Sequence, residues 1–254
     1  MRLAVLLSLL LASPAIVADE CRVRVASFNV ALNFPESGGL AAALATGDHG
    51  PARKLAAIIQ TVRPDVLLLN EVDHDPDMAG LTLLRDRFLA VGSDDRDGMR
   101  YEHTFTAPVN TGVPSGADLD RNGSIGGPGD AFGFGAFPGQ YGMAVLSRLP
   151  IDVGGARTFQ ELPWSALPAP AWPIDPETGE SWYDDDAKRV LRLSSKSHWD
   201  IPVELPGGAT LHLLASHPTP PVFDGPEDRN GLRNADEIRF WRYYIDGEPF
   251  RDDQ

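Results

Sequence analysis

The sequence contains one cysteine and comparatively few basic residues. A single cysteine in 254 residues allows no intrachain disulfide, so we expect the core and any bound metal to stabilise the fold. Basic residues number 22 against 36 acidic residues, and the net charge of −14 argues against tight, non-specific binding to polyanions. That balance does not exclude a groove that is locally basic. The length and a hydrophobic content of 43% are typical of one globular domain.

Long hydrophobic runs are also absent, apart from the first residues of the chain. Arg2 supplies a positive charge, Leu3 to Ala12 is apolar but too short to span a bilayer, and small residues follow up to Ala18. This pattern predicts an export signal over residues 1–18 and a domain over residues 19–254 without a transmembrane span. It therefore predicts a secreted or periplasmic protein. An uncleaved membrane anchor is the alternative interpretation.

Glycine (25) and proline (22) are frequent, which indicates long loops between the regular elements. The N-terminal order strand, helix, strand, helix implies a right-handed crossover that places the first two strands in one sheet. Apolar patterns predict strands at Val23–Val30, Val66–Asn70, Tyr101–Ala107, Met143–Ser147, Val190–Val203 and Thr210–Ser216. They predict helices at Pro51–Val62, Asp77–Phe88 and Leu232–Ile245, and Glu161–Trp182 is expected to be a long surface loop.

Polar residues end the first two expected strands. Asn29 follows one aliphatic run and Glu71 follows the next. In open sheets, side chains at the carboxyl ends of parallel strands leave the core at one edge, where ligands bind. A carboxylate beside a carboxamide is an all-oxygen pair that suits a hard cation such as Mg2+ or Mn2+. The pair predicts metal-dependent phosphoryl chemistry, and the alternatives are a surface carboxylate and a turn asparagine.

Four short motifs follow one another along the chain. They are Ser27-Phe28-Asn29-Val30, Leu68-Leu69-Asn70-Glu71-Val72-Asp73, the segment Tyr141 to Ile151, and Leu213-Leu214-Ala215-Ser216-His217. Together, over residues 22 to about 245, they resemble the endonuclease/exonuclease/phosphatase superfamily. The resemblance implies an α/β fold, a four-layer αββα sandwich of two mixed β-sheets flanked by helices, and a divalent-metal phosphoesterase.

The resemblance also implies roles for three residues. Glu71 matches the metal-binding glutamate, Asn29 the strand-end asparagine near the metal, and His217 the active-site histidine. A histidine at the end of a neighbouring strand can donate a hydrogen bond to a non-bridging oxygen or to the leaving group. For His217, a structural hydrogen bond at a loop entrance is the alternative.

Other basic side chains are candidates for contact with a substrate phosphate. Arg229 and Arg233 are four residues apart, so they share a helix face if the last helix begins early, and two guanidinium groups can clamp a phosphate. Salt bridges at a solvated helix start are the alternative. Lys196 and His198 lie two positions apart, on one face of an expected strand, and are further candidates for contact with substrate. The alternative is an ordinary polar outer face of the sheet.

The glycine-rich stretch contains a second metal-binding pattern. Over residues 118–125, oxygen donors occupy positions one, three and five, glycine position six and an aliphatic residue position eight, as in a calcium loop. Position twelve is Gly129 where a bidentate glutamate belongs. The pattern predicts a Ca2+ ion that pins the loop, and an Asx-turn loop is the alternative. The candidate ligands are Asp118, Asp120, Asn122 and Asp130.

The sequence departs from the superfamily near its C-terminus. The resemblance implies an Asp-x-Asn motif after a buried strand and a final Asp-His pair. Asp228-Arg229-Asn230 has the residue types of the first motif but no apolar strand before it, and no Asp-His pair follows His217. We therefore expect a truncated member that lacks the last strands of its second sheet. The favoured hypothesis is an exported phosphoesterase that acts on nucleic acid or on a small phosphorylated molecule, with no protein partner evident. The rival is a secreted, calcium-stabilised binding module or an inactive fragment on the same scaffold.

Overall fold

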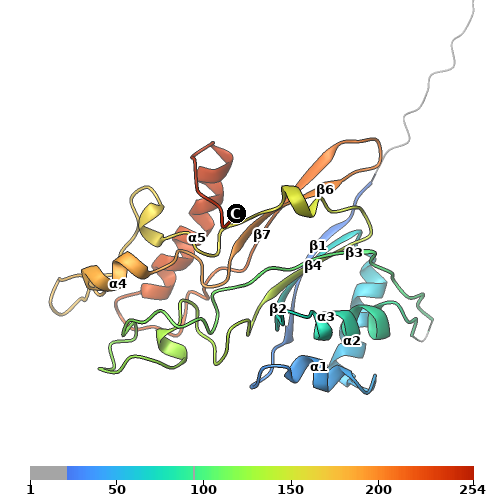
Figure 1. Cartoon of the computed structure of the whole chain (residues 1–254), viewed down its shortest axis with the longest axis horizontal. Helices are drawn as coiled ribbons and strands as arrows, with labels where there is room; N and C mark the ends of the chain where they lie inside the picture. The colour runs from blue at the N-terminus through green and yellow to red at the C-terminus, as the bar shows by residue number, and fades with distance from the viewer. Residues whose placement is uncertain (1–21, 94) are drawn as a thin grey trace, which may run out of the picture.

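The computed structural model of the chain describes residues 22–93 and 95–254, so the predicted export signal lies outside the described residues (Figure 1). The strands are β1 Val25–Leu32, β2 Val66–Val72, β3 His103–Phe105, β4 Met143–Ser147, β5 Arg157–Thr158, β6 His198–Glu204 and β7 Thr210–Ser216. The α-helices are α1 Gly39–Leu44, α2 Gly50–Val62, α3 Ala79–Leu83, α4 Asp185–Val190 and α5 Arg229–Ile245. A π-helical turn at Leu84–Leu89 continues α3, and 3-10 turns form at Pro128–Asp130, Val153–Gly155 and Trp164–Ala166.

The first sheet has the strand order β1-β2-β4-β3. β1 and β2 are parallel neighbours, and their register pairs Val25 with Val66 and Asn29 with Asn70. β4 runs antiparallel to both β2 and β3. β2 is buried almost throughout because it lies between two strands and contributes to an apolar cluster on each face. The parallel pairing confirms the expected arrangement and brings the ends of β1 and β2 to one sheet edge.

A β-bulge distorts the sheet where β1 and β2 end. Between the pairs Asn29–Asn70 and Leu32–Val72, β1 advances by one residue more than β2. Glu71 lies opposite the extra residue and adopts a left-handed backbone conformation with φ of 59°. Non-glycine residues rarely adopt this conformation, and bulges of this kind redirect side chains beside functional sites. The Glu71 side chain therefore leaves the strand in a direction that a regular strand would not give it.

The second sheet contains β5, β6 and β7 in that order, and both pairings are antiparallel. His198 at the start of β6 pairs with Ser216 at the end of β7, so His217 follows directly after the hairpin. The two sheets face each other across an apolar layer in which the fully buried Trp199 of β6 belongs to one cluster with Leu68 of β2. This packing brings strand ends from both sheets into the same region.

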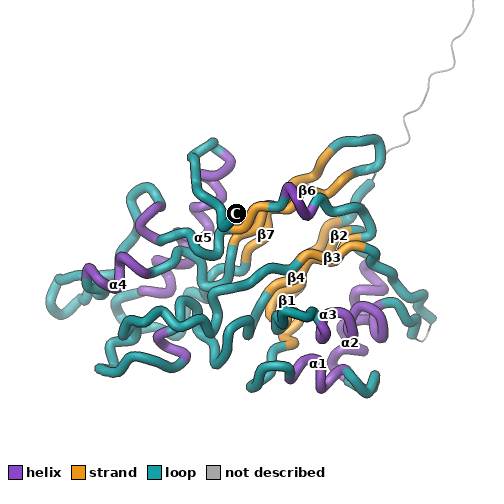
Figure 2. The backbone as a smooth tube through the Cα atoms, in the orientation of Figure 1, coloured by secondary structure: helices purple, strands orange, loops and turns teal. Residues whose placement is uncertain are grey.

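Helices α1, α2 and α3 lie against the first sheet, and α5 lies at one end of the second sheet (Figures 1 and 2). On the first sheet, Ile59 of α2 lies in one buried cluster with Leu67 and Leu69 of β2, and α1 and α3 contribute to the same cluster. On the second sheet, Phe240 of α5 packs against the ring of His198, with 4.6 Å between the ring centroids. The structure thus confirms a mixed α/β fold with two sheets and flanking helices.

The expected strand Val190–Val203 is wrong in its first half. Asp184 caps a short helix, its carboxylate accepting a hydrogen bond from the backbone N–H of Ala187 at 2.7 Å. That helix ends at Val190, and β6 begins only at His198. The intervening segment is irregular because its backbone groups bond to other parts of the chain instead of to a strand.

Two other predictions agree with the structure in outline. The last helix begins at Arg229, earlier than the expected Leu232. The segment Glu161–Trp182 is largely loop, as expected, but it is held in place by α5: Trp164 Nε1 donates to Asp236 Oδ2 at 2.7 Å, and both residues are fully buried. Loop character in the sequence therefore does not mean that this segment is free of the core.

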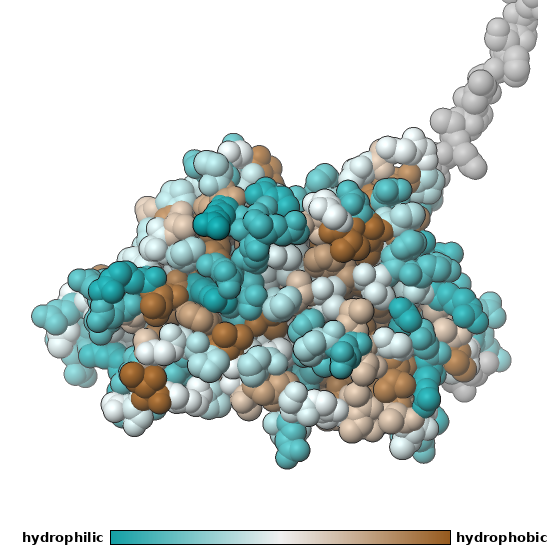
Figure 3. All heavy atoms as spheres, viewed as in Figure 1, coloured by the Kyte–Doolittle hydropathy of each residue, from teal (hydrophilic) through white to brown (hydrophobic). Residues whose placement is uncertain are grey.

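The surface is polar over most of the view in Figure 3, where brown apolar areas are separated by teal and white residues. Large apolar side chains that are exposed include Ile125, Phe134, Phe223 and Ile245. Within residues 22–93 and 95–254, no helix combines the length and the apolar character needed to cross a membrane.

Candidate functional site

The Glu71 carboxylate lies at the centre of a polar cluster at the bulged end of β1 and β2. Asn29 Nδ2 donates to Glu71 Oε1 at 2.8 Å, and Asn33 Nδ2 donates to Glu71 Oε2 at 3.3 Å. Both partners are neutral amides, and in the described part of the chain no lysine or arginine forms an ion pair with this carboxylate. Among the described residues, the Glu71 carboxylate therefore has polar support but no ion pair with a lysine or an arginine.

His217 brings the second sheet to this cluster. Its Nε2 lies 3.5 Å from Glu71 Oε1, and 18% of its side chain is exposed. The pKa of His217 is lowered to about 4, mainly by burial and then by the positive charge of Lys196, although Glu71 opposes both effects. A neutral imidazole has one N–H donor and one acceptor nitrogen. At neutral pH the ring can therefore donate a hydrogen bond or accept a proton beside the carboxylate.

The oxygen atoms at this sheet edge fit a hard divalent cation. Asn70 precedes Glu71 and pairs with Asn29 in the sheet, and its buried side-chain oxygen has no hydrogen-bond partner in the part of the chain that the structure describes. Its amide nitrogen donates to Ser27 Oγ at 3.3 Å. An unpaired buried oxygen is costly, and a bound cation would supply its missing partner. Glu71, Asn29 and Asn70 are therefore the residues that would hold a divalent cation.

Sequence reasoning did not single out Asn33, Asn70 or Asp73. The buried Asp73 carboxylate accepts hydrogen bonds from the backbone N–H groups of Phe34 at 2.7 Å and Tyr141 at 3.1 Å. Burial raises the pKa of Asp73 to about 6, although the two hydrogen bonds oppose the shift. Asp73 thus connects the segment after β1 to the segment before β4, close to the polar cluster around Glu71. The available signal was three polar residues within four positions at the end of an apolar strand.

The prediction that His198 contacts a substrate phosphate is wrong. His198 is fully buried, and its Nε2 lies 2.8 Å from the backbone oxygen of Glu237. Because a carbonyl can only accept, Nε2 carries the proton and the ring serves the packing of β6 against α5. Burial lowers the pKa of His198 to about 4.

The predicted arginine clamp is not formed. The nearly buried guanidinium of Arg233 donates, at 2.7 to 2.9 Å, to three backbone carbonyls, those of Phe132, Arg192 and Leu193. Arg229 forms an ion pair with Glu227, as the salt-bridge alternative predicts. The two guanidinium groups have separate partners within the chain, and they hold the start of α5 to its neighbours.

Glu237 of α5 connects the segments on either side of the site. Its fully buried carboxylate accepts hydrogen bonds from Ser195 N at 2.7 Å, Thr219 N at 2.6 Å and Thr219 Oγ1 at 3.0 Å. Arg233 Nε lies 3.7 Å from the same carboxylate. Ser195 lies just before β6 and Thr219 just after His217, so one side chain of α5 positions both segments.

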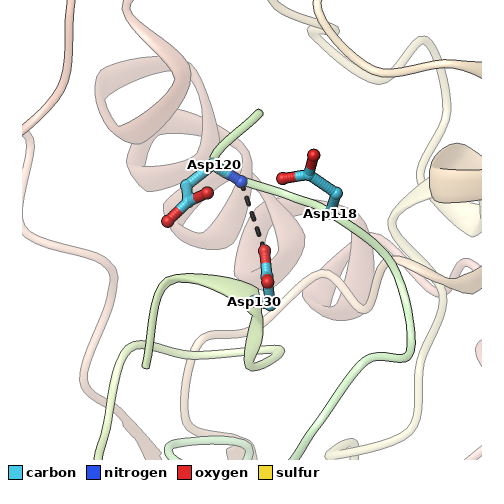
Figure 4. Close-up of side chains that lie close together, drawn as sticks. All are labelled: Asp118, Asp120 and Asp130. Atoms are coloured by element: carbon cyan, nitrogen blue, oxygen red, sulfur yellow. Dashed lines mark hydrogen bonds between the residues drawn. The ribbon is translucent and has the colours of Figure 1, made fainter. Parts of the chain in front are cut away.

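Asp118, Asp120 and Asp130 come together in the glycine-rich stretch (Figure 4). One carboxylate oxygen from each lies within 4.8 Å of the others. The Asp130 carboxylate accepts from Leu119 N at 2.7 Å, whereas the predicted ligand Asn122 uses its side-chain oxygen to accept from Ser124 N at 2.9 Å. The three carboxylates suit a calcium ion in charge and spacing. Calcium binding by this loop stays a prediction.

Comparison with known proteins gives a family match over much of this architecture. A model of the endonuclease/exonuclease/phosphatase family matches residues 26–199, which is more than half of the chain. No curated protein matches the chain. A solved structure described as an endonuclease/exonuclease/phosphatase from Beutenbergia cavernae DSM 12333 is similar, with 20% sequence identity and a TM-score of 0.44. The similarity covers 89% of this chain and 44% of that one, so the chain spans less than half of that protein's length.

Proposed function

Because the chain belongs to the endonuclease/exonuclease/phosphatase family, which is generally hydrolytic, we propose that it cleaves phosphate ester bonds with a divalent cation, Mg2+ or Mn2+. The observation that carries this proposal is the meeting of Glu71 and His217, which come from different sheets and approach to 3.5 Å. Asn29 supports the same carboxylate through its amide. In the proposed hydrolysis, water attacks the phosphorus atom while the ester oxygen leaves, and a carboxylate, an amide and a neutral imidazole at one point can hold the cation and stabilise the charge that develops.

Each residue has a distinct role in the proposed reaction. A divalent cation, when bound, would neutralise charge that develops on the phosphate oxygens. Glu71 would hold that cation together with the side-chain oxygens of Asn29 and Asn70, and the hydrogen bond of 2.8 Å from Asn29 would also fix the carboxylate. His217 would donate a hydrogen bond to a non-bridging oxygen or to the leaving oxygen. Its lowered pKa keeps the ring neutral at pH 7, so the neighbouring cation would not be repelled.

The substrate and the location are also part of the proposal. The net charge of −14 favours a small phosphorylated molecule over a long polyanion, although a nucleic acid remains an alternative substrate. The apolar N-terminal segment favours action outside the cytoplasm, in a secreted or periplasmic protein.

The test is hydrolysis of two chromogenic substrates, bis(p-nitrophenyl) phosphate and p-nitrophenyl phosphate, with added Mg2+ or Mn2+ and with a chelator. We expect metal-dependent turnover, and Glu71→Gln should reduce kcat by about 100-fold or more because it removes the charged metal ligand. Glu248→Gln, on an exposed residue after α5, removes the same charge and serves as the matched control. Equal turnover by both variants and the parent protein would refute the proposal.

The acidic loop favours a second candidate function, a calcium-stabilised binding module on the same scaffold. The carboxylates of Asp118, Asp120 and Asp130 lie within 4.8 Å of one another in a loop with no role in the proposed reaction. In this alternative, Ca2+ raises the melting temperature of the protein, and Glu71→Gln has no measurable effect on hydrolysis of the chromogenic substrates or on calcium binding. The chromogenic assays above therefore distinguish the two candidates.

A further inference from the structure

Lys196 places an ammonium group inside the protein close to the proposed site. It precedes β6, and only 6% of its surface is exposed. Within the described residues its Nζ has one hydrogen bond, a long one of 3.4 Å to Ser195 Oγ. An ammonium group has three donors, and burial without acceptors is costly. Among the described residues, the group therefore lacks acceptors for two of its three N–H donors.

The backbone around Lys196 is fixed from several sides. Asn110 N donates to the Lys196 carbonyl at 2.9 Å, and Ser195 N donates to the Glu237 carboxylate at 2.7 Å. Gly133 approaches so closely that a Cβ atom there would lie 1.9 Å from the Ser195 carbonyl oxygen. The bend that carries Lys196 is thus held by two loops and α5, and its position does not depend on a ligand.

The ammonium group interacts electrostatically with Glu237 and also with the Glu71 cluster. Its positive charge acts on His217, and it is attracted by the carboxylate of Glu237 and, more weakly, by that of Glu71. The sheet register explains the proximity, because His198 pairs with Ser216 and the residues just before β6 therefore run beside His217. Lys196 thus supplies positive charge at a point where the sheet edge otherwise presents a carboxylate.

A structural counter-ion for Glu237 is the competing role for Lys196. Glu237 already accepts three hydrogen bonds and has Arg233 Nε at 3.7 Å, so its charge is compensated without Lys196. Removing one partner of a buried ion pair strongly destabilises a fold, whereas replacing a buried charge that lacks partners by an apolar side chain relieves a desolvation cost. The two roles therefore predict opposite effects on stability.

We propose that Lys196 is a further catalytic residue, whose ammonium group binds a non-bridging oxygen of the scissile phosphate beside Glu71 and His217. This inference rests on the proposed phosphoesterase function. A phosphate oxygen supplies the acceptor that the ammonium group lacks, and a charge-assisted hydrogen bond becomes stronger as negative charge develops on the phosphate oxygens. The site would then contact phosphate through residues of both sheets.

The test compares Lys196→Met and Lys196→Gln with Lys54→Met, which removes the same charge from the exposed face of α2. The first readout is kcat for bis(p-nitrophenyl) phosphate with Mg2+, and the second is binding of inorganic phosphate in the presence of Mg2+, measured by calorimetry. We expect both Lys196 variants to lose about 100-fold in kcat and to bind phosphate roughly 10-fold more weakly. Their melting temperatures should equal or exceed that of the parent protein, and Lys54→Met should match the parent in all three measurements.

The outcomes separate this inference from the proposed function. If the parent protein hydrolyses the substrate and Lys196→Met retains kcat within about 3-fold, the role of Lys196 is refuted while the function stands. If the parent protein does not hydrolyse the substrate but its phosphate binding depends on Lys196, the phosphate contact stands and the function fails. Absence of phosphate binding by the parent protein, or unfolding of both Lys196 variants, refutes the inference in favour of the counter-ion role.

Discussion

The buried imidazole of His198 makes the stability of the fold depend on pH. The ring is fully buried, contacts Phe240 and Trp241, and has an Nδ1 atom without a hydrogen-bond partner among the described residues. Its pKa is about 4 in the fold, against 6.5 for an ordinary histidine. Between pH 6.5 and pH 4, His198 is protonated in the unfolded chain but neutral in the folded chain. The free energy of unfolding therefore falls as pH decreases from 6.5 to 4.

The size of this effect follows from the pKa difference. One pKa unit corresponds to about 1.4 kcal/mol, so His198 alone removes about 2 kcal/mol of folding free energy between pH 7 and pH 5. The variant His198→Gln cannot titrate, yet its amide can still donate to the Glu237 carbonyl. It should be less stable at pH 7, because its side-chain oxygen is buried, but its stability should decline less on acidification.

The assay is urea unfolding at pH 7, 6 and 5 in the presence of a chelator, with the free energy of unfolding extrapolated to water. His217 also has a lowered pKa, but it is present in both the parent protein and His198→Gln. The difference between the two proteins in the free energy lost on acidification therefore measures the contribution of His198. His103→Gln, on the half-buried strand β3, is the control and should decline like the parent protein. The reasoning is refuted if His198→Gln and the parent protein lose the same free energy between pH 7 and pH 5.

Two further predictions concern the calcium loop and the aromatic core. Saturating Ca2+ should raise the melting temperature by several degrees, because binding to the folded state alone stabilises it, and Asp118→Asn should remove this shift whereas the exposed Asp48→Asn should not. A shift that survives Asp118→Asn would place the calcium elsewhere. Phe240→Ala should reduce the free energy of unfolding by about 3 to 5 kcal/mol, because the fully buried ring packs against His198, Phe159 and Phe250. A loss below about 1 kcal/mol in urea unfolding would contradict this packing.

The sequence was most informative where strands end in polar residues. Asn29 and Glu71 could be singled out because each follows an aliphatic run, the resemblance to the superfamily added His217, and the structure brings all three together. Parallel neighbours in a sheet end at one edge, so the proximity of Asn29 to Glu71 follows from topology. The bulge that directs the Glu71 side chain, and the packing that brings His217 from the second sheet, could not be predicted from the sequence.

Buried polar residues were beyond the reach of the sequence pattern. His198 and Arg233 have residue types and spacing typical of a phosphate site, but burial and backbone acceptors decide their roles. Lys196 shows the converse, since its ammonium group is buried without enough acceptors. The π-helical turn after α3 and the cap at Asp184 depend on tertiary packing and single hydrogen bonds, which periodicity does not describe.

The single carboxylate of Glu237 has a consequence for the motions of the protein. It is bonded to the amides of Ser195 and Thr219, which lie far apart in sequence and on opposite sides of His217. Each amide can exchange its hydrogen with solvent only after its bond to Glu237 breaks, and movement of α5 away from the second sheet breaks both bonds together. A change in the packing of α5 therefore alters the hydrogen exchange of both segments at once.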